Sequence, residues 1–106
     1  MQMKNTANVR NLLQALLVPK NEDQAWRFLR DLLTAEEIRE FSRRLEVAQL
    51  LAEKVPYTQI EKKTGMSSTT IARVSKFLKG KWGGYKFVLN QLHHHTAPVS
   101  PVGSDV

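Results

Sequence analysis

Hydroxyl-bearing, small and cationic side chains are concentrated in one short stretch of the second half of the chain. Ser68 and Thr69 can exchange hydrogen bonds with base edges, and the methyl group of Ala72 suits a thymine methyl. Long cations such as Arg73 and Lys76 suit the phosphates that flank a groove. On one helix, these residue types predict contact with the major groove of duplex DNA.

Residues on either side extend this predicted DNA-binding surface. Thr58, Lys62 and Lys63 are expected to hold the preceding helix against the phosphate backbone. Glu61 lies in the same region, where a carboxylate is unfavourable; it either accepts a hydrogen bond from a cytosine amine or points away. Base contacts are assigned to Ser67, Ser68, Thr69 and Ala72. The complete predicted set is Thr58, Lys62, Lys63, Ser67, Ser68, Thr69, Ala72, Arg73, Lys76 and Lys79.

Two short helices with a tight turn between them are predicted to position these side chains. Ile60 and Thr64 lie one helical turn apart, and Gly65 can take the left-handed backbone that ends a helix. Ser67 can accept a hydrogen bond from an unpaired amide at the start of the second helix. Apolar residues at spacings of three and four predict the buried side of that helix: Ile71, Val74 and Leu78. The pattern favours a helix-turn-helix over residues 57–79, although ordinary helical hairpins share it.

The distribution of charge supports the DNA-binding interpretation. The formal net charge is +6. Residues 1–53 carry eight Lys or Arg and eight Asp or Glu, whereas residues 54–86 carry eight Lys or Arg and one Glu. A neutral half joined to a basic half is typical of proteins that bind a polyanion. The alternative is a lysine-rich face that only keeps the protein soluble.

Composition limits the other classes of function. The 106 residues include no cysteine, which excludes disulfides and thiolate metal sites and agrees with a cytoplasmic location. No apolar run approaches the roughly 20 residues of a membrane span, so no membrane partner is predicted. No nucleophile is paired with a base, so we expect neither an enzyme nor a cofactor. The histidines at 93–95 would point in different directions on a helix, so no metal site is predicted.

Three amphipathic helices are predicted ahead of the helix-turn-helix. The first ends before Pro19. Asn21 and Thr34 can cap the next two, with Gln24 and Glu37 placed to reach back to the cap amides. The third is expected to be the longest, with an apolar stripe at Ile38, Phe41, Leu45, Ala48 and Ala52 that Val47, Leu50 and Leu51 widen near its end. Three such helices offer more apolar surface than one thin chain can cover, so residues 5–56 are predicted to contribute to a homodimer.

The rest of the chain is simpler. A basic, glycine-rich break at 79–84 precedes a last helix over residues 84–95. Residues 1–95 are therefore predicted to form a single all-helical domain, followed by a disordered tail over 96–106.

Several of these residues also resemble those of a known family. Leu33-Thr34, Glu36-Glu37, Arg44, residues 60–65, Thr70-Ile71-Ala72-Arg73 and Leu78 resemble the bacterial tryptophan repressor in type and spacing. Residues 43–48 and 84–89 are closer still to an uncharacterised repressor-like branch of that family. The resemblance covers about residues 8–95. It implies an all-α, multi-helix, intertwined homodimer whose two helix-turn-helix units address successive major grooves.

The resemblance also concerns a small-molecule effector. In the family, two arginines sandwich the tryptophan indole and threonines line the pocket, which the resemblance matches to Arg44, Arg73, Thr34 and Thr70. Where the repressor has a glycine this chain has Val74, and where it has a serine this chain has Phe77. Overfilling a site of indole size costs about 1 to 3 kcal/mol, so we predict no useful binding of free tryptophan. If Arg44 and Arg73 do not bind an effector, they are expected to be solvated charges, ion-pair partners or phosphate contacts.

The leading interpretation is a sequence-specific DNA-binding transcriptional regulator, expected to be a repressor that works as a homodimer without tryptophan. The alternative is a helical protein–protein interaction module with a basic, solubilising face. Salt-dependent DNA binding separates the two. The sequence leaves open whether any effector exists.

Overall fold

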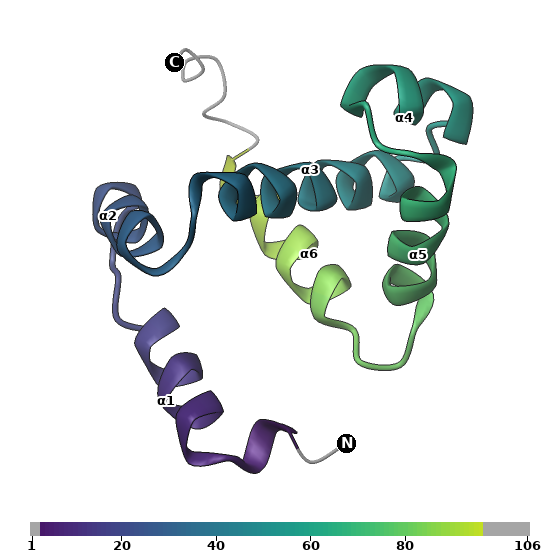
Figure 1. Ribbon diagram of the computed structural model, residues 1–106. Helices are drawn as coiled ribbons and strands as arrows, with labels where there is room; N and C mark the ends of the chain where they lie inside the picture. The colour runs from purple at the N-terminus through teal and green to yellow at the C-terminus, as the bar shows by residue number, and fades with distance from the viewer. Residues whose placement is uncertain (1–2, 97–106) are drawn as a thin grey trace. The chain divides into compact units, whose positions relative to one another are not determined.

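The computed structural model describes the backbone of residues 3–96 and the side chains of residues 3–92. These residues form one turn of 3-10 helix and six α-helices, with no strand among them (Figure 1). In chain order the elements are η1 (Met3–Asn5), α1 (Ala7–Leu16), α2 (Glu22–Leu32), α3 (Ala35–Ala52), α4 (Tyr57–Thr64), α5 (Ser68–Lys79) and α6 (Gly84–Thr96). The all-α prediction is confirmed. Among the described helices, none is both long enough and apolar enough to cross a bilayer.

Side-chain caps begin the second and third α-helices. The backbone N–H of Gln24 donates to the side-chain oxygen of Asn21 at 2.9 Å. The Gln24 side chain accepts from the N–H of Lys20 at 2.8 Å, so the predicted return bond reaches one residue earlier than Asn21. At α3 the predicted reciprocal cap forms in full. Glu37 N–H donates to Thr34 Oγ1 at 3.0 Å, and Thr34 N–H donates to Glu37 Oε1 at 2.9 Å.

The chain divides after Glu40 into two compact units. The first unit holds η1, α1, α2 and the start of α3. No residue of α1 or α2 is buried. Large apolar side chains of these two helices stay exposed: Leu12, Leu13, Leu16, Trp26 and Leu32. The apolar residues of α1 and α2 are therefore only partly covered within this unit.

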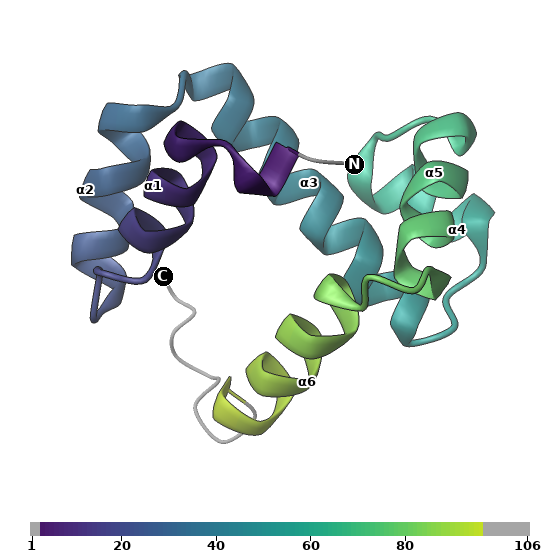
Figure 2. The same ribbon diagram turned by 90° about the horizontal axis from the view of Figure 1, so that it is seen from below.

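The second unit has a small core shared by three helices and a turn. Its buried apolar residues are Val47 and Ala48 of α3, Ile60 of α4, Met66, and Ile71 and Val74 of α5. Helix α5 contacts both α4 and α6, and Figure 2 shows α4 and α5 side by side. The predicted α3 stripe is covered only in part, because Ala48 and Val47 are buried whereas Phe41 and Ala52 are exposed. Which face of α3 is covered depends on where α4 and α5 pack, and residue spacing alone does not reveal this.

Two further predictions concern the organisation of the whole chain. The single domain predicted over residues 1–95 stays a prediction. The tail predicted over 96–106 lies outside the described residues, except for Thr96, which ends α6.

Candidate nucleic-acid interface

A tight, well-bonded turn joins α4 to α5. Gly65 has a φ of 74°, as predicted, and its N–H donates to the carbonyl oxygen of Glu61 at 2.9 Å. The Thr64 hydroxyl donates to the carbonyl oxygen of Ile60 at 2.7 Å and accepts from the N–H of Met66 at 3.1 Å. Thr64 is buried, so both bonds lie away from water. Thr64 lies on the buried face of α4, as predicted, but its polar role was not predicted, although a threonine directly before a C-cap glycine could have suggested it.

Ser67 begins α5, as predicted. Its Oγ accepts from the N–H of Thr70 at 3.2 Å and donates to Thr70 Oγ1 at 3.2 Å. The Ser67 hydroxyl proton is therefore engaged within the helix start. Ser68 and Thr69 follow in the first turn with exposed side chains. The exposed hydroxyls of this end of α5 are thus carried mainly by residues 68 and 69.

Helix α5 has two different sides. Its buried residues are Ile71, Val74 and Ser75, and the first two belong to the core of the second unit. The opposite side is exposed and carries Thr69, Ala72, Arg73, Lys76 and Lys79. Spacings of three and four residues align these exposed positions along the helix. One side of α5 therefore fixes the helix, while the other presents small and cationic side chains to solvent.

The remaining predicted DNA-binding residues lie on α4. Thr58, Lys62 and Lys63 are exposed, whereas Glu61 is half-buried. All ten residues of the predicted set are thus exposed and belong to the second unit. The sequence from residue 62 to residue 92 contains no Asp or Glu. Glu61 is therefore the one acidic residue of the sequence between residues 54 and 92, which includes α4 and α5.

The residues of the possible effector pocket are divided between the two units. Thr34 belongs to the first unit, whereas the other five belong to the second. The Arg44 guanidinium carbon lies 5.4 Å from the centre of the Phe41 ring, a cation–π geometry. Thr70 is half-buried and bonded to Ser67. Arg73 is exposed on α5.

Val74 and Phe77, the two residues predicted to fill the indole site, have different surroundings. Val74 is 3% exposed and belongs to the core, whereas Phe77 is 56% exposed. Phe77 lines an open hollow of about 470 Å³ together with Leu45, Trp82, Gly84, Tyr85 and Val88. None of these lining residues is charged. A zwitterionic amino acid would lose hydration there without gaining a charged partner.

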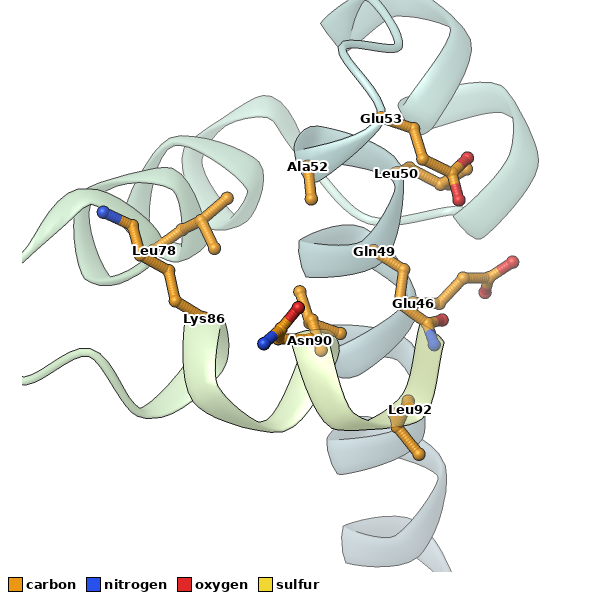
Figure 3. A pocket seen from close by; sticks show the side chains of 10 residues that line it. Glu46, Gln49, Leu50, Ala52, Glu53, Leu78, Lys86, Asn90 and Leu92 are labelled. Carbon is orange, nitrogen blue, oxygen red and sulfur yellow. The ribbon is translucent and has the colours of Figure 1, made fainter. Parts of the chain in front are cut away.

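A second hollow of about 700 Å³ lies between α3, α6 and the end of α5 (Figure 3). Leu50, Leu78 and Leu89 give it apolar walls, while Glu46 and Lys86 bring opposite charges to it. This hollow was not predicted from the sequence. Among the described residues, no group of three or more His, Cys, Asp or Glu is placed to hold a metal ion.

Comparisons with known proteins agree with this arrangement of helices. The family model described as "Trp repressor protein" matches residues 7–93. The chain is 37% identical over 81 residues to the uncharacterized protein YerC of Bacillus subtilis, covering 76% of this chain and 78% of that protein. A crystal structure of a TrpR-like protein from Eubacterium eligens is similar with a TM-score of 0.81 and 40% identity, covering 87% of this chain and 95% of the other. The family match runs from α1 into α6.

Proposed function

Because the chain belongs to the Trp repressor protein family, we propose that it is a cytoplasmic transcriptional regulator that binds duplex DNA through α4 and α5. The observation that carries this proposal is the two-sided character of α5. Ile71 and Val74 anchor one side in the core, while Thr69, Ala72 and Lys76 remain exposed on the other. A helix held in this way can enter a major groove without losing its support.

The exposed residues divide into two roles in this proposal. Ser68, Thr69 and Ala72 contact base edges, because their short side chains allow the helix to approach the groove floor. The long cations, together with Thr58, contact phosphates: Lys62, Lys63, Arg73, Lys76 and Lys79. Ser67 takes part chiefly by fixing the start of α5, since its hydroxyl already bonds to Thr70.

The regulator is proposed to act as an intertwined homodimer. The exposed apolar side chains of α1 and α2 support this, because the described part of the first unit leaves them uncovered. Burial against a second copy would contribute about 25 cal/mol for each Å² of apolar surface removed from water. Two α5 helices related by a two-fold axis would then address half-sites about 34 Å apart.

Repression without tryptophan is the specific form of regulation we propose. A dimer that covers two successive major grooves can exclude other proteins from the same DNA. Val74 fills core space where the family has a glycine, and Phe77 places a ring where it has a serine. The hollow beside Phe77 offers no charged residue for an amino acid. Both observations favour a helix-turn-helix, formed by α4 and α5, that is held in place without a ligand.

Selection of bound sequences from a random duplex pool tests the proposal directly. We expect enrichment of sites with two related halves spaced by one helical turn of DNA. The control is a protein carrying Thr69→Asp and Ala72→Asp, whose carboxylates oppose both groove and phosphate without disturbing the buried side of α5. Failure of the unchanged protein to enrich any sequence would overturn the proposal of sequence-specific binding.

A further inference from the structure

Trp82 is a large aromatic residue whose side chain is mostly exposed to solvent. Its side chain is 81% exposed, in the loop between α5 and α6. It borders the hollow beside Phe77, but most of its surface remains in water. Exposure of so large a ring is unfavourable, and tryptophan is enriched where proteins make contacts. The proposed function so far gives this residue no role.

The loop begins tightly against the end of α5. The N–H of Gly80 donates to the carbonyl oxygen of Phe77 at 3.1 Å. A Cβ atom at Gly80 would lie only 3.3 Å from the carbonyl oxygen of Lys76, so the chain passes close to the last turn of the helix. Trp82 follows Lys79 by three residues, which limits the distance between their Cα atoms to about 11 Å. The ring is therefore near the cationic end of α5.

The length of α5 places this end beyond the groove in the proposed complex. Its 12 residues span about 18 Å, whereas the major groove of B-DNA is about 12 Å wide. With the first turn of α5 at the base edges, the last turn and the following loop lie over the groove's edge. The sugar–phosphate backbone forms that edge, with a phosphate every 3.4 Å of axis along each strand.

Charge favours DNA over a protein as the partner of this loop. Lys79 and Lys81 precede Trp82, Lys86 follows on α6, and all three are exposed. No Asp or Glu occurs from residue 62 to residue 92. A protein partner would have to supply acidic groups here, whereas duplex DNA supplies them at every nucleotide. These lysines follow Arg73 and Lys76 of the exposed side of α5 in the sequence, with no acidic residue between them.

We propose that the α5–α6 loop is a second DNA contact, in which Trp82 packs on the sugar–phosphate backbone beside the groove read by α5. Its Nε1–H donates to a phosphate oxygen, its ring covers the adjacent sugar, and Lys81 neutralises a neighbouring phosphate. This inference rests on the proposed DNA binding and adds to it a contact that is independent of base sequence. It also gives the exposed ring a partner that is apolar at the sugar and polar at the phosphate.

Tryptophan fluorescence tests the contact directly, because the chain has only two tryptophans, Trp26 and Trp82. In a Trp26→Phe protein, Trp82 is the only reporter. A random-sequence duplex of about three helical turns at 50 mM salt is the probe. We expect the duplex to change Trp82 emission and to reduce quenching by acrylamide, a neutral quencher.

Variants in the same Trp26→Phe protein separate the chemical roles. Trp82→Ala is expected to weaken duplex binding about tenfold at every salt concentration, leaving the salt slope unchanged. Lys81→Ala should instead lower that slope by about one. The matched control is Phe87→Ala, which removes another exposed ring, 68% exposed on α6, and should leave affinity unchanged.

The outcomes distinguish failure of the loop contact from failure of the proposed DNA binding. Full duplex binding with unchanged Trp82 emission and quencher access overturns the loop contact while leaving the role of α5 intact. Emission that depends on protein concentration but not on DNA assigns Trp82 to a surface between copies of the chain, and this also overturns it. Absence of duplex binding by the unchanged protein at any salt would defeat the proposed function itself.

Discussion

The hydroxyl of Thr64 and the backbone N–H of Met66 form a 3.1 Å hydrogen bond inside the turn between α4 and α5. The same hydroxyl donates to the carbonyl oxygen of Ile60, so one side chain closes α4 and orients the chain that leads into α5. Both Thr64 and Met66 are 8% exposed. The angle at which α5 leaves the core therefore depends on a buried polar group.

Replacement of Thr64 by Val tests the importance of this bridge. The substitution preserves shape but leaves the Met66 N–H without its acceptor, which should lower the free energy of unfolding by about 1 to 3 kcal/mol. Urea unfolding measures the change. Thr58→Val, at an exposed position of α4, is the control and should leave stability nearly unchanged. Equal midpoints for the two variants would show that the bridge contributes nothing.

Gly65→Ala tests the left-handed backbone at the end of α4. No atom lies within 4 Å of a Cβ placed there, so the expected loss of about 1 to 2 kcal/mol comes from the positive φ alone. Gly84→Ala offers the matched control, since Gly84 also has open space and begins α6 without a positive φ. There the extra methyl group should be neutral or stabilising by up to about 1 kcal/mol. The account of the turn fails if both variants lose the same stability.

The oligomeric state tests the interpretation of α1 and α2. We expect sedimentation equilibrium to give twice the 12.1 kDa of one chain, and a melting temperature that rises with protein concentration. Leu16→Glu should shift the equilibrium toward the single chain, because it places a charge among exposed apolar side chains of α1. Gln14→Glu introduces the same charge at an exposed polar position of α1 and should leave the dimer intact. A mass of one chain at all concentrations would contradict the dimer.

Titration calorimetry with tryptophan tests the proposed independence from a corepressor. No heat of binding is expected at micromolar protein and ligand, and duplex affinity should be the same with and without tryptophan. The physical reasons are the core position of Val74 and the uncharged hollow beside Phe77. Micromolar binding to the pure protein would refute this part of the account.

Local features of the fold were predictable from the sequence, because neighbouring residues determine them. The caps at Thr34 and Ser67 and the left-handed Gly65 depend on bonds that span four residues or fewer. The type and order of the helices followed from apolar spacing in the same way.

Features that depend on tertiary packing were not predictable. Ala48 of the predicted α3 stripe is buried, but Phe41 and Ala52 stay exposed, because α4 and α5 cover only part of α3. Val74 lies in the core, as the spacing in α5 predicts, whereas Phe77 borders a hollow that also involves α3 and α6, which spacing does not reveal. The exposure of Trp82 likewise follows from the path of the loop, which composition does not determine. The predicted DNA-binding set remains a prediction, although every member of it is exposed.

The charge of α5 is tested by Lys76→Glu, measured by fluorescence anisotropy of a labelled duplex. We expect weaker binding to all sequences alike and a salt slope lowered by about one, because Lys76 contacts phosphate rather than bases. Lys20→Glu makes the same change at an exposed position of the first unit and should leave duplex binding unchanged. Unchanged affinity for Lys76→Glu would remove this side of α5 from the DNA.

The salt dependence of duplex binding by the unchanged protein is the most direct test of DNA recognition. With about six phosphate contacts, we expect affinity to fall roughly a thousandfold between 50 and 200 mM salt. A gel shift that follows this dependence would agree with docking of α4 and α5 on DNA. The absence of any shift at 50 mM salt would contradict it and favour a protein–protein interaction module.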